Sequence, residues 1–574
     1  MAVEALVAEA LSRASNAEAL DLALQVPDFE ATPRLSYLAA LACARMGAAS
    51  EARSRLAAID TAALDPALAA QVTSLAARLA KDRGDAREAL ERYREALRLA
   101  PGAYPAVNAA TMAHLLGDAA TRDELARQAL RLAPEQGDHW DWASRGEALL
   151  LLGRGDESAR AYETARELAR GRHGDVASMR RQLRLIGSAH AVRMLEVLAS
   201  AQVLAFTGHM IDAPGRPAPR FPAALEGEVR SRIAAEIRRM PGAIGYSQAA
   251  CGADLLFLEA MQDAGHETQV VLPFATGDFV RESVAFAGPG WVERFERALG
   301  RATRVIHATE EPYLGDDILF EHASNLIQGM AMLRAAELET RATMLAVAEG
   351  SGGAGLGGTA ANVRQWKARG GEVIELTLAS AGAPSAGQAP MPGGGAHARR
   401  VLKSILFSDI TGFSRMPEQY SPRFAELFLG AARASLDRLA ITPADANTRG
   451  DGLYIVFDQP SEAADFALAL GEAIGAIPWT ELGMPGATHV RTGLHVGPVF
   501  HTLDPIMGKP TFNGSHVNRA ARLEPIVRPG EVFVTHAFAA TLALGRTAHR
   551  CEYIGVTPLA KGFGSAPLYR LVRA

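Results

Sequence analysis

The chain has 574 residues, of which 48% are hydrophobic and 21% are charged, and its formal net charge is −5. This length exceeds what a single hydrophobic core serves, so we expect about three or four folded domains. The charge gives no reason to expect nucleic acid or a membrane surface as a partner. Three widely spaced cysteines without metal-ligand spacing, a start unlike a signal peptide and the absence of long apolar runs predict a cytoplasmic protein.

Residues 1–198 are predicted to be all α-helical and contain an internal repeat. The segments GDAREALERYREALRLAP (84–101) and GDAATRDELARQALRLAP (117–134) align with each other. The pattern resembles the tetratricopeptide repeat, whose marker positions are occupied here by Gly84, Ala89, Tyr93, Ala96 and Pro101. Stacked helix pairs of this kind bury a continuous core and present a concave surface. The resemblance implies a protein partner for that surface, and a helical cap that serves its own chain is the alternative.

Residues 199–378 are predicted to form an α/β domain. Short apolar segments such as AQVLAFTGHMID, ETQVVLPF and GEVIELTL alternate with helical segments, which gives six candidate strands. Such alternation is typical of a parallel sheet covered by helices.

Two turns in this region, SQAACGAD (247–254) and GSGGAGLGGTAAN (350–362), are rich in small residues. Backbone N–H groups at such turns favour phosphate or another anion. The region resembles the Rossmann-like SLOG group of nucleotide-binding domains, which implies a small nucleotide-like ligand. The enzymes of that group carry a proline-glycine-glycine turn and a glutamate that are missing here, so we expect ligand sensing rather than a second enzyme such as a nucleotide glycosidase. The candidate ligand-binding residues are Gly208, Gly252, Gly357, Gly358 and Thr359; the alternative is that these glycines only permit close packing of helix on sheet.

Residues 379–399 are dominated by Ala, Gly, Pro and Ser and are predicted to be a flexible linker. A further domain is expected over residues 400–574. Within it, FSDITGFS places Asp409 at the end of an apolar strand, and NTRGDGLYIVF places Asp451 in a turn before another strand. Two carboxylates delivered by separate strand ends are suited to hold two Mg²⁺ or Mn²⁺ ions around phosphates. The backbone at Gly412 and Phe413 would then cover a triphosphate.

Five segments of this domain together resemble the class III nucleotide cyclase catalytic domain, which implies an α+β, ferredoxin-like fold. Asp409 and Asp451 match the metal-binding aspartates, and Ile410 matches the residue that adds a backbone carbonyl ligand. Arg491 in VRTGLHVGPVF and Lys561 in LAKGFGSAPLYRL match the phosphate-binding cations. The resemblance implies conversion of a nucleoside triphosphate to a 3′,5′-cyclic nucleotide and pyrophosphate.

The segment GSHVNRAARLEPI carries Asn518 and Arg522 four residues apart, and therefore on one helix face. They match the family pair that orients the ribose and stabilises the pentacovalent phosphorus. In the family each site takes residues from two subunits, so the resemblance implies a homodimer.

The residues that match the base-recognising positions of the family are Asn447 and Thr511, and Arg449 stands near them where an apolar residue is common. Threonine suits bacterial adenylate cyclases, whereas asparagine can donate or accept a hydrogen bond and decides little. ATP is the expected substrate, because cyclisation of adenine nucleotides is the commonest activity in the family that the domain resembles. UTP or CTP, as in phage-defence cyclases, and GTP remain alternatives, as does a catalytically silent nucleotide-binding scaffold.

Overall fold

The computed structural model describes residues 2–12, 16–134, 136–216, 219–349, 358–378, 400–411, 413, 416–484, 488–545 and 548–574. The chain divides into two compact units. Residues 1–201, 337–340 and 552–555 form the first unit, and the second unit comprises residues 202–336, 341–551 and 556–574. None of the helices in the described ranges is both long enough and apolar enough to span a membrane. The predicted linker, residues 379–399, lies outside the described residues.

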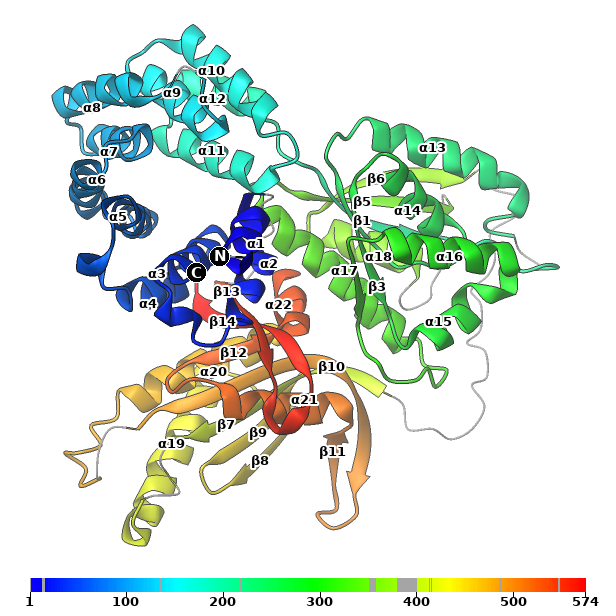
Figure 1. Ribbon diagram of the computed structural model, residues 1–574. Coiled ribbons are helices and arrows are strands. Elements are labelled where there is room, and N and C mark those ends of the chain that lie inside the picture. Colours follow the sequence, from blue (N-terminus) through cyan, green and yellow to red (C-terminus); the bar gives the residue numbers. More distant parts are fainter. Residues whose placement is uncertain are drawn as a thin grey trace. The chain divides into compact units, whose positions relative to one another are not determined.

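The first unit consists of helices that pack in consecutive pairs (Figure 1). These helices are α1 (Ala2–Ser12), α2 (Asn16–Leu24), α3 (Pro33–Arg45), α4 (Ala49–Ala57), α5 (Pro66–Asp82), α6 (Ala86–Leu99), α7 (Ala103–Leu115), α8 (Ala119–Leu132), α9 (His139–Leu151), α10 (Gly155–Leu168), α11 (His173–Ile186) and α12 (Ala189–Val197).

The repeat signature explains this packing. Ala89, Tyr93 and Ala96 of α6 are fully buried, so the small residues admit the neighbouring helix and the tyrosine fills the space between pairs. Gly84 and Gly117 have φ of +86° and +76°, a backbone conformation that lets the chain reverse between one helix and the next. The prediction of tetratricopeptide-like repeats is thereby confirmed.

The middle part of the chain contains a six-stranded parallel sheet with the order β4-β3-β2-β1-β5-β6. Its strands are β1 (Val203–Gly208), β2 (Ile244–Ser247), β3 (Glu267–Leu272), β4 (Arg304–His307), β5 (Ala342–Glu349) and β6 (Glu372–Leu378). The helices between them are α13 (Glu226–Arg238), α14 (Ala253–Asp263), α15 (Thr276–Ser283), α16 (Pro289–Arg301), α17 (Ile318–Glu337) and α18 (Thr359–Ala368). The predicted parallel α/β sheet is confirmed, and its strand order reverses direction between β1 and β5, where ligand clefts of such sheets occur.

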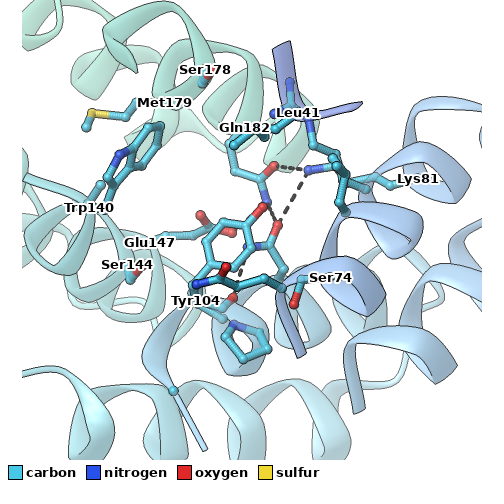
Figure 2. A pocket seen from close by; sticks show the side chains of 18 of the residues that line it. Leu41, Ser74, Lys81, Tyr104, Trp140, Ser144, Glu147, Ser178, Met179 and Gln182 are labelled. Atoms are coloured by element: carbon cyan, nitrogen blue, oxygen red, sulfur yellow. Dashed lines mark hydrogen bonds between the residues drawn. The ribbon is translucent and has the colours of Figure 1, made fainter. Parts of the chain in front are cut away.

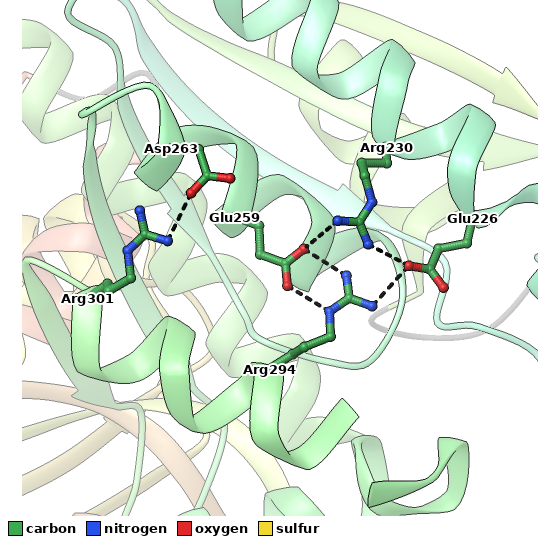
Figure 3. Close-up of polar contacts among 6 residues, drawn as sticks. All are labelled: Glu226, Arg230, Glu259, Asp263, Arg294 and Arg301. Atoms are coloured by element: carbon green, nitrogen blue, oxygen red, sulfur yellow. Dashed lines mark hydrogen bonds and ion pairs between the residues drawn. The ribbon is translucent and has the colours of Figure 1, made fainter. Parts of the chain in front are cut away.

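An ion-pair network joins three helices of this domain (Figure 3). Arg294 of α16 makes two parallel N–H···O bonds, each of 2.7 Å, to the carboxylate of Glu259 in α14. It also donates at 3.0 Å to Glu226 at the start of α13. The guanidinium carbon lies 4.0 Å from the ring centroid of Trp291, so the cation is held between a carboxylate fork and an aromatic face.

The C-terminal part of the chain is an α+β domain built on a mixed sheet with the order β13-β14-β12-β10-β7-β9-β8, and β11 pairs with β10. Its strands are β7 (Arg400–Ile410), β8 (Asp445–Arg449), β9 (Gly452–Phe457), β10 (Val490–Asp504), β11 (Lys509–Asn513), β12 (Val532–Thr535), β13 (His549–Pro558) and β14 (Ser565–Arg573). Its helices are α19 (Ser421–Leu439), α20 (Pro460–Gly475), α21 (Ser515–Leu523) and α22 (His536–Ala543). This architecture agrees with the predicted α+β class.

Candidate functional site

The central strand β7 brings three predicted site residues together. β7 pairs antiparallel with β10, and this register sets Asp409 directly opposite Arg491. On its other side β7 pairs antiparallel with β9, where Ser408 faces Leu453, two residues after Asp451. Asp451 lies in the short turn that joins β8 to β9. The ladder therefore places both carboxylates at one end of β7.

Arg491 holds this arrangement through its guanidinium. Its Nη2 donates to Oδ2 of Asp409 at 2.6 Å and lies 3.0 Å from Oε1 of Glu524. Glu524 begins the short 3₁₀ turn η7 (Glu524–Ile526) that follows α21. The sequence alone did not point to this glutamate. Glu524 lies two residues after Arg522, in a segment where a glutamate is expected to be an ordinary exposed residue, so its role could hardly be predicted from the sequence.

The carboxylates of this cluster repel one another. Burial raises the pKa of Asp451 to about 6, and the neighbouring Asp409 adds to the effect. Burial raises the pKa of Glu524 to about 7, although Arg491 opposes the shift. One arginine therefore does not offset the negative charge gathered here, and a further cation would stabilise the site.

The donor set fits a divalent metal. Asp409 and Asp451 supply hard carboxylate oxygens of the kind that Mg²⁺ and Mn²⁺ prefer, and Ile410 ends the same strand. Within the described ranges, no group of three or more His, Cys, Asp or Glu side chains converges as a ligand set. The remaining ligands would come from the Ile410 carbonyl, substrate phosphates and water, which is how Mg²⁺ is commonly bound.

The other predicted catalytic residues lie on a second group of elements. Asn518 and Arg522 belong to α21, and η8 (Ala560–Gly562), which carries Lys561, contacts that helix. Asn518 and Lys561 are exposed. The predicted site residues of one chain therefore fall into two half-sets, and no hydrogen bond or ion pair among the described residues joins Asn518, Arg522 or Lys561 to Asp409 or Asp451.

The base-recognising positions fall on β8 and β11, which lie next to each other. Asn447 is exposed on β8, and Thr511 of β11 donates its hydroxyl to Oδ2 of Asp445 at 3.0 Å. The Nζ of Lys509 lies 3.3 Å from the other oxygen of Asp445. The sequence alone did not mark Asp445 as a candidate site residue. It could have been found from its position two residues before Asn447, because alternate residues of a strand lie on the same face. For Arg449 only the backbone in β8 is described, and Gly412 lies outside the described residues.

Two further side chains near these elements have ring contacts in the domain. The ring of Phe413 packs 4.8 Å from that of Phe424. His516 of α21 is buried, and its Nδ1 lies 2.8 Å from Nε2 of His495 in β10, in a pair of parallel rings.

A separate cavity of about 350 Å³ opens in the parallel sheet domain where the strand order reverses. Its lining includes Gly208, which ends β1, together with Gly358 and Thr359 at the start of α18. Gly252 does not line it: a Cβ there would lie 2.4 Å from the backbone N of Ile211, so this glycine permits a close approach of two chain segments. Gly357 lies outside the described residues.

The polar groups of this cavity are partly engaged with one another. Nδ2 of Asn362 donates to the hydroxyl of Thr207 at 3.0 Å and to that of Ser324 at 3.3 Å. Burial raises the pKa of Asp254 to about 7 and lowers that of His209 to about 4. The cavity thus holds both groups in an environment that disfavours their charged forms.

Comparisons with known proteins match two parts of the chain. Residues 399–570 match the family model described as the adenylate and guanylate cyclase catalytic domain. Residues 15–113 match the model described as Tetratricopeptide Repeats-Sensor. No curated protein matches the chain.

Several solved structures are similar to the C-terminal part. The guanylate cyclase domain of RhGC from Catenaria anguillulae in complex with GTP is 21% identical, with a TM-score of 0.26, and the match covers 30% of this chain and 96% of that one. The adenylyl cyclase CyaB from P. aeruginosa is 19% identical, with a TM-score of 0.27, and the match covers 31% and 96%. An adenylate cyclase structure from Trypanosoma brucei is 20% identical, with a TM-score of 0.26, and the match covers 30% and 89%.

The family match spans the whole C-terminal domain, including the strand ladder that gathers Asp409, Asp451 and Arg491. The C-terminal domain of this chain is a class III nucleotide cyclase catalytic domain, and the chain is accordingly an enzyme of the phosphorus–oxygen lyase type.

Proposed function

We propose that the protein converts a nucleoside triphosphate, with ATP as the first candidate, into a 3′,5′-cyclic nucleotide and pyrophosphate. The observation that carries this proposal is the meeting of Asp409 and Asp451 at one end of β7, opposite the guanidinium of Arg491. In the reaction the ribose 3′-oxygen attacks the α-phosphorus in line, and the bond from that phosphorus to the leaving pyrophosphate breaks. The chain must therefore bind a triphosphate, orient the ribose and offset the charge that develops on phosphorus.

Asp409, Asp451 and the carbonyl of Ile410 would hold two Mg²⁺ or Mn²⁺ ions. Such ions, when bound, lower the pKa of the attacking hydroxyl and neutralise triphosphate charge. Arg491 keeps Asp409 in place by its 2.6 Å hydrogen bond and adds positive charge beside the phosphates.

The second half-set acts on the ribose and the phosphorus. Asn518 would orient the ribose ring, and Arg522 would stabilise the pentacovalent phosphorus. Lys561 would offset charge on the departing pyrophosphate together with Arg491. Loss of one such charged contact is expected to cost about a hundredfold in turnover or more.

Class III cyclase domains bind nucleotides and typically work as dimers. We propose that this chain forms a homodimer in which the half-set of Asp409, Asp451 and Arg491 meets Asn518, Arg522 and Lys561 of the second copy. The absence of any hydrogen bond or ion pair between the two half-sets, among the residues that the structure describes, is consistent with this arrangement.

The choice of ATP has support beyond the threonine itself. Thr511 and Asp445 form a group of oxygen acceptors beside Asn447, held by Lys509. Acceptors suit a base with an exocyclic amino group, which adenine and cytosine carry, better than the carbonyl that guanine presents at the equivalent position. CTP is therefore the second candidate.

The cavity of the parallel sheet domain is proposed as a regulatory site for a small nucleotide-like ligand. Support comes from its place at the reversal of strand order and from Gly208, Gly358 and Thr359 in its lining. The domain would sense this ligand and change the rate of the cyclase.

The test is product analysis. The purified protein is incubated separately with ATP, GTP, CTP and UTP in Mn²⁺, and cyclic products are identified by mass spectrometry, with Asp451→Asn as the inactive control. Cyclic AMP from the wild type alone is the expected result. A different cyclic product corrects the base, and the same product from the variant would overturn the assignment of the metal site.

A further inference from the structure

The helical repeats form a cavity that the proposed cyclase reaction does not use. Its volume is about 890 Å³, and it is lined by side chains of α3, α5, α7, α9 and α11 (Figure 2). Sites for small molecules and cofactors commonly measure about 300–1,000 Å³. The family match to the repeats ends at residue 113, so α9 and α11 contribute walls that this match does not include.

Side chains from four helices meet across this cavity. Gln182 of α11 accepts a hydrogen bond from Nζ of Lys81 in α5 at 2.8 Å. The amide nitrogen of Gln182 donates to Oε1 of Glu147 in α9 at 2.7 Å and approaches Oδ1 of Asn108 in α7 at 3.4 Å. An extended peptide lying along a concave face needs a continuous groove, whereas these hydrogen bonds cross the space between the helices. The cavity therefore suits a small molecule better than a peptide.

Lys81 places in the cavity a cation that makes no direct ion pair among the described residues. Its ammonium group contacts the amide oxygens of Gln182 and Asn108, and among the described residues no carboxylate lies within ion-pair distance of it. The nearest carboxylate of the network, on Glu147, instead accepts hydrogen bonds from Thr111 and Gln182. Burial lowers the pKa of Lys81 to about 8, although Asp82 and Glu147 oppose the shift, so an anion bound beside the ammonium group would stabilise its charged form.

The arginines of the cavity wall differ from Lys81 because they have carboxylate partners. Nε of Arg78 lies 3.7 Å from Asp82, Nε of Arg181 donates to Glu339 at 3.0 Å, and Arg184 is paired with Glu339 as well. Lysine is also rare in this chain, where it occurs at positions 81, 367, 403, 509 and 561. Lys81, which makes no ion pair among the described residues, is therefore a lysine in a protein whose cations are mostly arginines.

Aromatic rings provide the second feature of the site. Tyr37, Tyr104 and Trp140 line the cavity, and Tyr104 keeps 40% of its surface exposed although it stands inside the helical unit. One neighbour of Tyr104 is Tyr93, which meets it edge to face at 6.3 Å. An accessible ring of this kind can stack on a planar group of a ligand.

We propose that this cavity binds a small anion that carries a planar ring, the chemistry that a nucleoside monophosphate offers. The phosphate would pair with Lys81, and the base would lie against Tyr104 and Trp140. The repeats would thus hold a ligand site of their own, where the repeat signature alone predicts a surface for a protein partner.

Isothermal titration calorimetry on the full chain tests this proposal. AMP, GMP, CMP and UMP are titrated in EDTA, so that the metal-dependent cyclase site contributes little. At least one of them is expected to bind with an affinity that depends on Lys81, whereas any binding in the parallel sheet domain should be the same in all variants of the repeat cavity. The corresponding nucleosides and inorganic phosphate should each bind the repeat cavity at least about tenfold more weakly. Lys81→Met should weaken binding by about tenfold or more, and Lys81→Arg, which keeps the charge, should weaken it less.

Lys367→Met is the matched control, because Lys367 is an exposed lysine paired with Glu375 in the parallel sheet domain. It should leave the affinity unchanged. Tyr104→Ala gives a second test that keeps the charge network, and it should weaken the monophosphate but not inorganic phosphate. Circular dichroism spectra show whether each variant is folded. If no monophosphate binds, or if binding is the same in folded Lys81→Met and Tyr104→Ala, the proposal is wrong.

Discussion

Asp409 and Asp451 show how single residues of the cyclase domain affect both stability and the proposed metal site. The two carboxylates lie together at one end of β7, and the pKa of Asp451 is raised to about 6 by burial and by its neighbour. An acid whose native pKa is raised prefers to be protonated, so its charged form destabilises the metal-free fold at neutral pH.

The variant Asp451→Asn separates catalysis from stability. We expect turnover to fall by about a hundredfold or more, because a metal ligand is lost. Without metal at pH 7.5, the variant should be at least as stable as the wild type, because the amide carries no charge. A cyclase assay and thermal melts in EDTA measure the two effects. Asp437→Asn, at an exposed position of α19, should change neither; a fall in metal-free melting temperature in Asp451→Asn alone would contradict the argument.

Asp254 in α14 makes a pH-dependent contribution. It is 9% exposed, and burial raises its pKa to about 7. Between about pH 4 and 7 the native state keeps a proton that the unfolded state has released, so the free energy of unfolding falls as pH rises through this range. Three pKa units correspond to at most about 4 kcal/mol.

Asp254→Asn keeps the side-chain shape and removes the titration. Its stability is expected to change less than that of the wild type between pH 5 and 8, and the variant should be the more stable protein at pH 8. Urea unfolding midpoints at four pH values measure the difference. Parallel curves for the two proteins would show that Asp254 does not titrate in this range.

At the scale of elements, the sheet domain is tied together by Arg294. The side chains of Arg294 and Glu259 are 16% and 19% exposed, so this fork is shielded from solvent. The pair Arg301–Asp263 joins the same two helices, α16 and α14, but is 43% and 71% exposed. The two pairs therefore form a natural comparison of a shielded with an exposed ion pair (Figure 3).

Arg294→Met is expected to cost about 1–3 kcal/mol, because Glu259 and Glu226 each lose a partner. Arg301→Met should cost about 0.5 kcal/mol or less, since exposed pairs contribute little. The methionine side chain can still cover Trp291, so the fall in the free energy of unfolding measures mainly the lost charge interactions of Arg294. Urea unfolding followed by tryptophan fluorescence compares the variants, and equal losses would contradict the role given to the shielded fork.

In the proposed homodimer, each site takes its two half-sets of predicted catalytic residues from different chains. Within one chain, Asp409, Asp451 and Arg491 form one group, while Asn518 and Arg522 lie on α21 in another. The arrangement predicts that two inactive chains can complement each other.

A mixture of Asp451→Asn and Arg522→Ala chains tests this expectation. Each variant alone should be inactive. Random pairing gives about half heterodimers with one intact site out of two, so activity should recover to about a quarter of the wild-type value. Turnover assays after subunit exchange, with each variant alone as control, measure the recovery. No recovery in proven heterodimers would place both half-sets in one chain.

Local patterns were sufficient to predict much of this protein. The repeat could be predicted because Gly84 and Gly117 follow helices at the same place in two similar segments, and alanines mark where the next helix approaches. Asp409 and Asp451 could be predicted as metal-binding residues because each carboxylate lies at one end of an apolar strand, where a charged side chain is unusual without a ligand. These features depend on neighbours within a few residues, and the sequence alone therefore determined the helical repeats, the parallel sheet and the cyclase domain.

Other features were decided by tertiary structure. Glu524 joins Arg491 only because η7 follows a helix packed on β10, and Asp445 meets Thr511 only because β8 and β11 are neighbours. Gly252 was predicted to bind a ligand, yet its hydrogen faces the backbone of Ile211, which no local pattern reveals. The cavity around Lys81 needs four helices spread over more than a hundred residues. Contacts between distant segments follow from strand register and helix packing, and these exist only once the chain has folded.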